Sequence, residues 1–283
     1  MLYLTPSKRH WSGFPMTPDW TRLADFALHL AGVSADAILP WFRSPLVVED
    51  KSGSGKAFDP VTEGDRAGER ALRAAIAAQF PDHGIIGEEY GETPGTSPFT
   101  WVLDPVDGTR SFMIGMPNWA TLIALYHHGQ PVIGVMNQPH VGECFLGTPE
   151  GAWLHRHGEA KALKTRRGVP LRAAAIGTTA PELYHSPDDA AGFAALRQSC
   201  RLMRYGGDAY FFCLMAAGHL DIAMDAGLQA FDIGALIPII TGAGGVVGSW
   251  SGDDPAQGGN IISAGSPALL DEAIAVMQAK KPA

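Results

Sequence analysis

Cysteine is scarce in this chain. Its 283 residues include three cysteines, Cys144, Cys200 and Cys213, which are scattered and show no CxxC or similar metal-binding spacing. An odd number of isolated cysteines argues against a disulfide framework, so reduced thiols in a cytoplasmic protein are the simplest interpretation.

Clustered positive charge is also missing. The formal net charge is -8, the pI is about 5.6, and no block of lysine and arginine occurs. Because nucleic-acid affinity comes mainly from neutralising backbone phosphates, a nucleic-acid partner is disfavoured. An acidic protein that handles phosphate would need metal ions to offset the charge repulsion.

Long apolar runs are absent as well. No run of about 18 apolar residues occurs, so the sequence predicts no transmembrane helix and no membrane partner. Lys8 and Arg9 lie near the N-terminus without an apolar stretch after them, so no signal peptide is visible. The apolar share of 46% and the charged share of 18% are ordinary for a globular protein.

The first part of the chain shows helical spacing. Apolar residues recur at helical intervals from Trp20 to Leu30, and Thr17-Pro18 is typical of a helix start. A loop is predicted over residues 51–56. The predicted helices of this part are 20–30, 35–42 and 63–80, the last capped by Thr62, and the predicted strands are 47–48 and 84–87.

The pattern changes in the middle of the chain. From residue 120 to 155 short apolar runs alternate with glycine-containing turns, which indicates an antiparallel meander. Strands and helices alternate after that. The sequence thus predicts an α/β (α+β) protein of two layered subdomains, residues 1–163 and 164–283, which meet near the basic segment 161–168.

The most informative segment is Trp101–Phe112. Its apolar start ends abruptly in two aspartates, Asp104 and Asp107, followed by Gly108 and Thr109. A strand that delivers two carboxylates to its end, before a glycine turn and a helix start, can hold a hard cation beside a phosphate group.

Carboxylates gather at three further places where a strand or loop meets a helix. No histidine or cysteine cluster accompanies them, and all-oxygen ligation favours Mg²⁺, Mn²⁺ or Ca²⁺ over Zn²⁺. Mg²⁺ suits phosphate chemistry best, because it accepts a few carboxylates together with phosphate oxygens and water. The three segments are Asp59–Asp65, Gly87–Tyr90 and Phe231–Asp232.

Each acidic residue also has a structural interpretation. Asp65 can complete a capping box with Thr62, and Asp232 can cap a helix, although burying it unpaired in an apolar stretch would be costly. Glu88 can be a solvated strand end, and Asp104 and Asp107 can be turn residues. The joint occurrence of these residues is the stronger argument for a site.

Together the motifs resemble the inositol monophosphatase family of Mg²⁺-dependent, lithium-sensitive phosphatases. The resemblance covers roughly residues 20–279. Phe231 and Gly234 stand where the family usually has tryptophan and alanine, and neither change removes a ligand. The segments that carry the resemblance are Asp59–Asp65, Ile86–Glu89, Trp101–Phe112, Phe231–Ala235 and Gly242–Val246.

The resemblance implies a layered α-β-α-β-α sandwich and a metal-assisted hydrolysis of a small-molecule phosphate ester. It implies that Asp65 and Thr109 activate the attacking water, that the N–H groups of Gly108 and Thr109 hold the phosphate, and that the protein is a homodimer, with residues 112–119 as a candidate interface. The implied ligands of two or three Mg²⁺ ions are Glu88, which is also counted as catalytic, Asp104, Asp107, Asp232 and the carbonyl group of Val106.

The segment Tyr205–Tyr210 resembles the histidinol-phosphate phosphatase branch of the family. Because histidinol phosphate carries an amine and an imidazole, a cationic leaving group would favour a carboxylate contact. Asp208 and Asp225 are the candidates, and Arg110 is a further candidate substrate contact. Asp208 can instead cap a helix at 209–217.

Two other functions stay open at this point. One is hydrolysis of another small ester, such as inositol 1-phosphate, a sugar bisphosphate or a nucleotide 3′-phosphate. The other is a non-catalytic regulatory or scaffold protein built on this fold.

Overall fold

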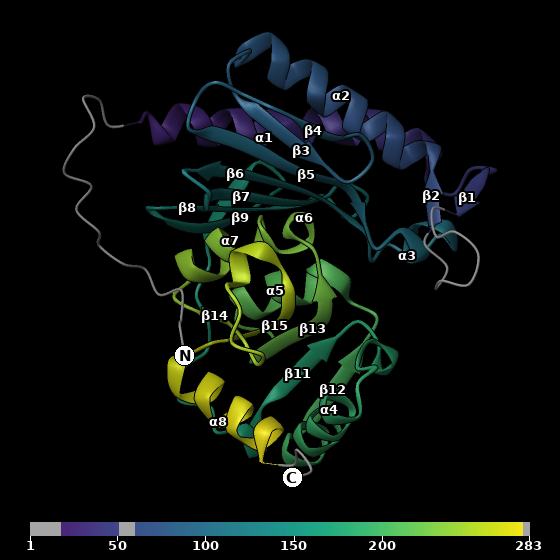
Figure 1. Cartoon of the computed structure of the whole chain (residues 1–283). Helices are drawn as coiled ribbons and strands as arrows, with labels where there is room; N and C mark the ends of the chain where they lie inside the picture. The colour runs from purple at the N-terminus through teal and green to yellow at the C-terminus, as the bar shows by residue number, and fades with distance from the viewer. Residues whose placement is uncertain (1–17, 51–59, 280–283) are drawn as a thin grey trace.

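The computed structural model describes residues 18–50 and 60–279. Figure 1 shows alternating layers in the order helix, sheet, helix, sheet, helix, which confirms the predicted fold class. Helices α1 (Trp20–Ile38) and α2 (Glu63–Gln79) cover the outer face of the first sheet. The middle layer holds α5 (Asp208–Ala216), α6 (Ala230–Ile233) and α7 (Leu236–Gly242), and the last layer holds α4 (Pro187–Ser199) and α8 (Pro267–Gln278).

The first sheet has eight strands in the order β10-β9-β8-β7-β6-β5-β3-β4. Strands β5 to β10 are joined in sequence as antiparallel neighbours, so the predicted meander is confirmed, while β3 pairs parallel to β5. The bounds are β3 Gly84–Gly87, β4 Gly91–Thr93, β5 Phe99–Asp107, β6 Ala120–His127, β7 Gln130–Gln138, β8 Glu143–Thr148, β9 Gly151–Arg156 and β10 Glu159–Ala162.

The second sheet has five strands in the order β12-β11-β13-β15-β14. Its bounds are β11 Ala175–Thr178, β12 Leu202–Tyr205, β13 Ile222–Leu228, β14 Val246–Ser249 and β15 Gly259–Ala264. A short ribbon of β1 (Val48–Asp50) and β2 (Pro60–Thr62) lies before α2. The division into subdomains 1–163 and 164–283 stays a prediction.

Helix α7 packs against the first sheet with its backbone. A Cβ atom on Gly134 of β7 would lie 1.9 Å from the carbonyl oxygen of Ala235, and one on Gly147 of β8 would lie 2.2 Å from the amide nitrogen of Ile239. Only glycine permits such an approach. The middle layer is therefore held firmly on the sheet that carries β5.

The start of α1 differs from the sequence expectation. The helix begins at Trp20, and the side chain of Asp19 caps it by accepting a hydrogen bond from the amide of Arg22 at 3.0 Å. An aspartate just before the first turn of a helix can accept a hydrogen bond from a backbone amide that has no partner within the helix. The expected cap, Thr17, lies outside the described residues.

The separate helix expected over 35–42 is wrong. Helix α1 continues to Ile38, and a 3-10 turn, η1 (Leu39–Trp41), follows it. A single glycine, Gly32, does not stop a helix whose other residues pack on a sheet. Asp59, the loop at 51–56 and the N-terminal segment 1–16 also lie outside the described residues.

Among the described residues, one helix is long and apolar enough to cross a membrane by length and composition. It runs from Trp20 to Trp41 with a mean hydropathy of 1.3, which the sequence analysis did not anticipate. Its residues Leu23, Ala27 and Leu30 are buried, and it lies beside α2 against the first sheet (Figure 1). We interpret it as a helix of the outer layer.

Candidate active site

The site is built on the end of β5. Residues three apart on a regular strand point to opposite faces. The pairing of β5 with β6 shifts between Asp104 and Asp107, so an irregularity breaks this alternation. Carboxylate oxygens of Asp104, Asp107 and Asp232 consequently all lie within 4.8 Å of one another.

Asp232 reaches this cluster from α6. It lies in the first turn of that helix, and its Oδ2 atom accepts a hydrogen bond from the amide of Gln229 at 2.6 Å. The capping role considered from the sequence is therefore confirmed. The same carboxylate also faces Asp104 and Asp107, so capping fixes its place in the cluster.

The carboxylates repel one another strongly. Burial and then the negative charges of Glu88, Asp107, Asp232 and Asp65 raise the pKa of Asp104 well above its ordinary value. Its Oδ1 atom is buried and has no hydrogen-bond partner within the described part of the chain. A buried carboxylate oxygen without a donor is costly. A cation bound by oxygen ligands would remove that cost, so these residues fit a metal ion.

Glu88 lies just after β3, the parallel neighbour of β5. Its amide donates a hydrogen bond to the carbonyl oxygen of Leu103 at 3.2 Å. Glu88 does not belong to the group of carboxylates whose oxygen atoms lie within 4.8 Å of one another. Its negative charge nevertheless raises the pKa of both Asp104 and Asp65, so its carboxylate lies close to the cluster.

Asp65 joins the site from the first turn of α2. Its Oδ2 atom accepts hydrogen bonds from the amide of Thr62 at 2.8 Å and from the Thr62 hydroxyl at 2.5 Å, which confirms the predicted capping box. The hydroxyl of Thr109 lies 3.4 Å from Oδ1 of Asp65 and 3.0 Å from the carbonyl oxygen of Val106. Burial raises the pKa of Asp65 to about 6, although the bonds from Thr62 act in the opposite direction.

Gly108 turns the chain from β5 into helix α3 (Thr109–Met113). Its φ is 80°, in the left-handed region that favours glycine. A Cβ atom at this position would lie 2.7 Å from the carbonyl oxygen of Asn118 and 3.3 Å from Oδ2 of Asp208. Glycine is thus required both for the turn and for the close approach of the later half of the chain.

A hollow beside the cluster of Asp104, Asp107 and Asp232 brings together residues far apart in the sequence. Four aspartates are among its lining residues: Asp107, Asp208, Asp225 and Asp232. The amide of Ala209, at the start of α5, donates to Oδ2 of Asp107 at 2.9 Å. Apolar residues complete the lining, including Phe212, Leu228 and Leu236.

Asp208 does not cap α5 with its side chain. Gly207 is the N-cap residue, and a glycine has no side chain with which to cap the helix. The Asp208 carboxylate instead lies near the hydroxyl groups of Thr179 and Ser111 and near the positive charge of Arg110. These groups partly offset the effect of burial, which raises the pKa of Asp208. The capping interpretation is therefore wrong.

Asp225 is held by two threonines at the end of β11. Its Oδ1 accepts from the Thr178 hydroxyl at 2.8 Å and the Thr179 amide at 2.7 Å, and its Oδ2 accepts from the Thr179 hydroxyl at 2.8 Å. Burial raises the pKa of Asp225 to about 7 despite these bonds. The bonds use three of the roughly four acceptor positions of a carboxylate, which leaves room for a ligand.

No motif in the sequence marked Thr179 or Ser111 as a site residue. Thr179 donates to Asp225 and Ser111 lies near Asp208, and no spacing pattern in the sequence marks such distant contacts. Thr179 donates from both its amide and its hydroxyl to Asp225, and it lines the same hollow as Asp208.

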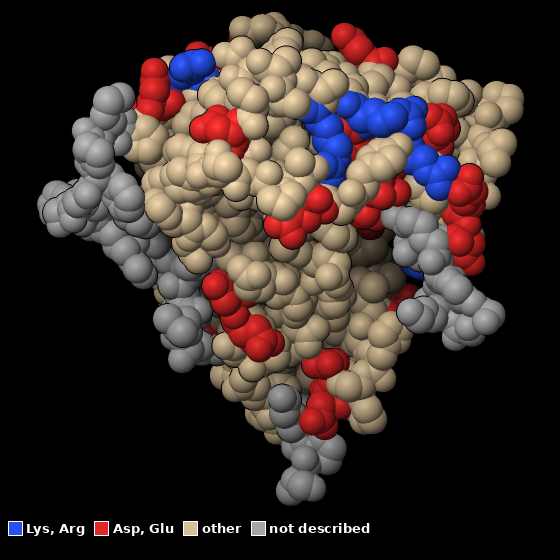
Figure 2. Space-filling view, turned by 45° about the horizontal axis from the view of Figure 1, so that its top comes forward, with Lys and Arg blue, Asp and Glu red and all other residues tan. Residues whose placement is uncertain are grey.

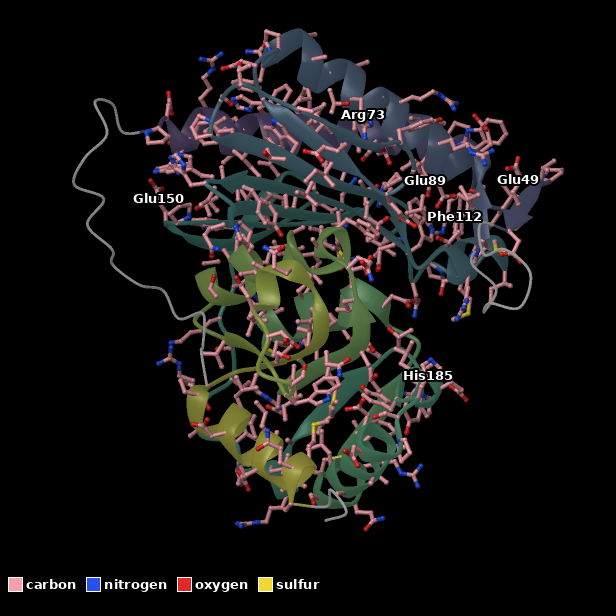
Figure 3. All side chains as sticks on the ribbon, viewed as in Figure 1. Glu49, Arg73, Glu89, Phe112, Glu150 and His185 are labelled. Atoms are coloured by element: carbon pink, nitrogen blue, oxygen red, sulfur yellow. The ribbon has the colours of Figure 1, made fainter. Side chains whose placement is uncertain are left out.

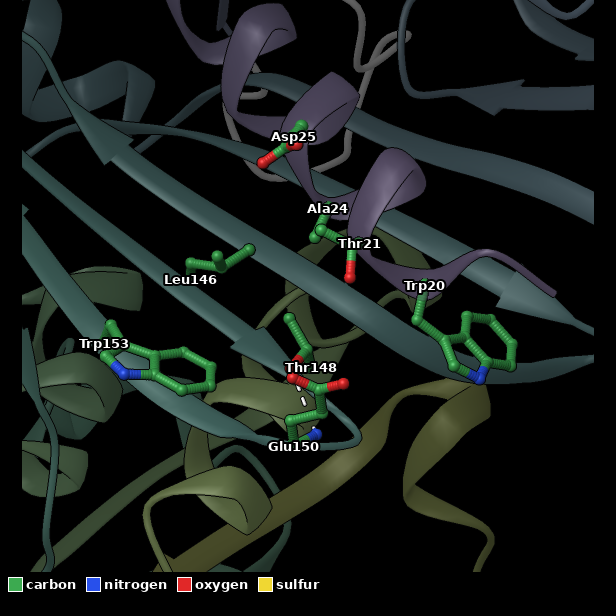
Figure 4. A pocket seen from close by; sticks show the side chains of 8 residues that line it. All are labelled: Trp20, Thr21, Ala24, Asp25, Leu146, Thr148, Glu150 and Trp153. Carbon is green, nitrogen blue, oxygen red and sulfur yellow. Dashed lines mark hydrogen bonds between the residues drawn. The ribbon is translucent and has the colours of Figure 1, made fainter.

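A second hollow lies between the start of α1 and strands β8 and β9 (Figure 4). Trp20, Trp153, Asp25 and Glu150 are among its lining residues, and none of the candidate site residues is. The candidate site residues thus lie at the acidic hollow beside β5 and not at this second one.

The chain is similar to several known proteins. A model described as the inositol monophosphatase family matches residues 19–281. The histidinol-phosphatase of Chlorobaculum parvum is 34% identical over 260 residues, which cover 88% of this chain and 93% of that protein. The bifunctional phosphatase IMPL2, chloroplastic, of Arabidopsis thaliana is 33% identical over 264 residues, which cover 89% of this chain and 74% of that protein.

A similar solved structure is that of an inositol monophosphatase from Zymomonas mobilis. It is 35% identical with a TM-score of 0.80, and the match covers 93% of this chain and all of that one.

Proposed function

The chain belongs to the inositol monophosphatase family, and we propose that it is a histidinol-phosphatase, which hydrolyses L-histidinol phosphate to L-histidinol and phosphate. The observation that carries this proposal is the pair Asp208 and Asp225, which line the same hollow as Asp107 and Asp232. Two carboxylates beside a phosphate site suit a leaving group that carries an amine and an imidazole. The similarity to a protein named histidinol-phosphatase supports the same substrate.

The proposed metal ligands are Glu88, Asp104, Asp107, Asp232 and the carbonyl oxygen of Val106, which would hold about two or three Mg²⁺ ions. Bound Mg²⁺ supplies charge neutralisation and Lewis-acid polarisation of phosphate and water oxygens. The lone Oδ1 atom of Asp104 and the crowding of the carboxylates support this assignment. Val106 can take part although Thr109 already contacts its carbonyl oxygen, because a carbonyl oxygen has two lone pairs.

The water-activating role belongs to Asp65 and Thr109. A carboxyl group with a pKa of about 6 is ionised at neutral pH and can accept a proton there. The Thr109 hydroxyl lies between Asp65 and Val106, where it can orient a water molecule. The amide groups of Gly108 and Thr109 lie at the start of α3 and would hold the phosphate oxygens.

Arg110 gives a specific reason to keep a second substrate in view. Its positive charge lowers the pKa of Asp208 and so offsets part of the negative charge there. A compensated carboxylate also suits the neutral hydroxyl groups of a polyol. Inositol 1-phosphate is therefore the second candidate, and the similarity to an inositol monophosphatase structure favours it.

A phosphate-release assay with Mg²⁺ separates these possibilities. Histidinol phosphate should be hydrolysed with a kcat/KM at least about tenfold above that of inositol 1-phosphate, a difference of about 1.4 kcal/mol. A sugar bisphosphate and a nucleotide 3′-phosphate complete the panel. Asp104→Asn serves as the control and should release phosphate from none of them.

Equal or reversed rates on the two main substrates would overturn the histidinol-phosphatase assignment. A folded wild-type protein that released phosphate from no substrate would favour the non-catalytic alternative. The homodimer stays a prediction: Phe112 and Trp119 are buried within the chain, so an interface at 112–119 would use exposed residues such as Ile114 and Met116.

A further inference from the structure

Glu69 is a fully buried glutamate outside the candidate site. It lies on α2, one helical turn after Asp65, and its side chain is 0% exposed. Its Oε2 atom accepts a hydrogen bond from the amide of Glu89 at 2.7 Å, and its Oε1 atom accepts one from the amide of Tyr90 at 3.1 Å. These are the two peptide groups that directly follow Glu88.

Arg73 completes the arrangement from the next turn of α2. Its Nε donates to Oε1 of Glu69 at 2.7 Å, and its two terminal nitrogens donate to the hydroxyl of Thr93, at 3.0 Å, and to the carbonyl oxygen of Gly91. Figure 2 shows such arginines grouped with acidic side chains on the face that carries α2. Figure 3 labels Arg73 on α2 and Glu89 near the end of β3, both in the upper half of the molecule.

The hairpin of β3 and β4 is shaped around this carboxylate. Gly87 and Gly91 pair across the hairpin, so residues 88–90 form its turn. A Cβ atom on Gly87 would lie 2.0 Å from Oε1 of Glu69. Glycine at this position therefore leaves the space that the Glu69 carboxylate occupies beneath the turn.

We propose that Glu69 is a positioning residue that fixes Glu88 for metal binding. The backbone of Glu88 is held on one side by its hydrogen bond to Leu103 of β5, and on the other by Glu69 through the next two amides. A buried carboxylate is costly unless it is paired and hydrogen-bonded, and an apolar side chain would cover β3 at lower cost. Hydrogen bonds on both sides of Glu88 therefore fix its backbone, and a metal ligand must be held in place to within about 0.5 Å.

This inference rests on the proposed function, because it takes Glu88 as a metal ligand. The competing explanation is that Glu69 stabilises the fold only. Asp221 supplies the matched control, since it is also 0% exposed, is paired with an arginine, Arg166, and accepts a backbone amide, that of Ala175, at 2.7 Å. It lies just before β13 of the second sheet, whereas Glu88 follows β3 of the first sheet.

The test measures Mn²⁺ binding to the full chain by electron paramagnetic resonance, without substrate, for wild type, Glu69→Gln and Asp221→Asn. The side-chain amide introduced by Glu69→Gln would present an NH₂ group to a backbone N–H, so the turn should shift. We expect Glu69→Gln to weaken at least one Mn²⁺ site by about 10- to 100-fold, the usual effect of losing a group that orients a metal ligand. Asp221→Asn should lower the melting temperature with less than about a twofold change in Mn²⁺ affinity.

Equal Mn²⁺ binding by wild type and folded Glu69→Gln would overturn the proposal, and so would an equal loss in Asp221→Asn. If Glu69→Gln does not fold, Arg73→Gln removes the group that orients Glu69 from a more accessible position, and unchanged Mn²⁺ affinity in that variant would overturn the proposal as well. A wild-type protein that binds no Mn²⁺ would instead overturn the metal site itself, and this inference with it.

Discussion

Gly108 and Asp208 both have a positive φ, of 80° and 44°, at the point where the two halves of the chain meet. For a residue with a side chain this conformation costs about 1–2 kcal/mol. At Gly108 the cost would be added to a clash with Asn118 and a close contact with Asp208. The strained residue is Asp208, which lines the hollow, so the strain belongs to the assembly of the site.

We expect Gly108→Ala to lose at least about tenfold in phosphate release, because the added Cβ displaces the turn that presents the amide of Thr109. Gly129→Ala is the matched control. Gly129 has a φ of 75°, and its added Cβ would meet nothing within 4 Å among the described residues. Both variants should lose stability in urea unfolding. Full activity in Gly108→Ala, or an equal loss in Gly129→Ala, would contradict the role of this turn.

Among single residues, those that belong to a motif could be predicted from the sequence. Those that matter only through contacts with distant residues could not. Asp104, Asp107 and Asp232 stand in recognisable segments, and the structure brings their oxygens together. Thr179 stands in no pattern, because its importance comes from donating to Asp225, which lies 46 positions later. The sequence allowed Asp208 to be a helix cap, because aspartate is common at helix starts. Its neighbours in the structure are Thr179, Ser111 and Arg110, which are distant in the sequence.

Elements with strong local signals were predicted well. Helix α2 begins after Thr62 with the expected capping box, and β3 has the expected bounds. The helical stretch from Ala230 to Gly242 is divided into two helices, α6 and α7. Pro238 lacks the amide that would bond to the carbonyl oxygen of Gly234, so an uninterrupted helix is disfavoured there.

The irregularity in β5 could not be predicted in the same way. It depends on the register with β6, which the sequence of β5 alone does not contain. That irregularity is what brings Asp104 and Asp107 to one side. The placement of the two aspartates of β5 thus depends on how β5 pairs with its neighbour β6.

At the scale of the whole molecule, the site joins the two sheets. The amide of Ala209 donates to Asp107, and the side chain of Asn118 donates to the carbonyl oxygen of Gly206 at 2.6 Å. Several carboxylates gather at this junction in a chain whose net charge is already -8. Metal binding and the stability of the molecule should therefore be linked.

The linkage has a predictable pH dependence. Burial raises the pKa of Asp65 from 3.8 to about 6 and that of Asp225 to about 7, so the folded chain retains protons that the unfolded chain releases. The contribution of these two groups to the stability of the metal-free protein should be greatest below about pH 4. It should be lost as the pH rises from about 4 through the folded pKa values of about 6 and 7. Bound Mg²⁺ should offset this loss.

Melting curves with EDTA and with saturating Mg²⁺ test this. The rise in Tm caused by Mg²⁺ should be larger at pH 8 than at pH 5 by a few degrees, roughly the effect of 1–2 kcal/mol in a chain of this size. Asp104→Asn should show little Mg²⁺-dependent rise at either pH. An equal rise at both pH values in the wild-type protein would contradict the linkage.

The central claim is that the choice of substrate depends on acidic residues outside the cluster of Asp104, Asp107 and Asp232. The most direct test is the ratio of kcat/KM for histidinol phosphate to kcat/KM for inositol 1-phosphate, measured in the variant Asp208→Asn. Asparagine tolerates the positive φ at this position, so the backbone should be preserved. We predict that kcat/KM for histidinol phosphate falls at least about tenfold while that for inositol 1-phosphate changes less than about twofold. Equal losses on both substrates, with the ratio unchanged, would contradict the account.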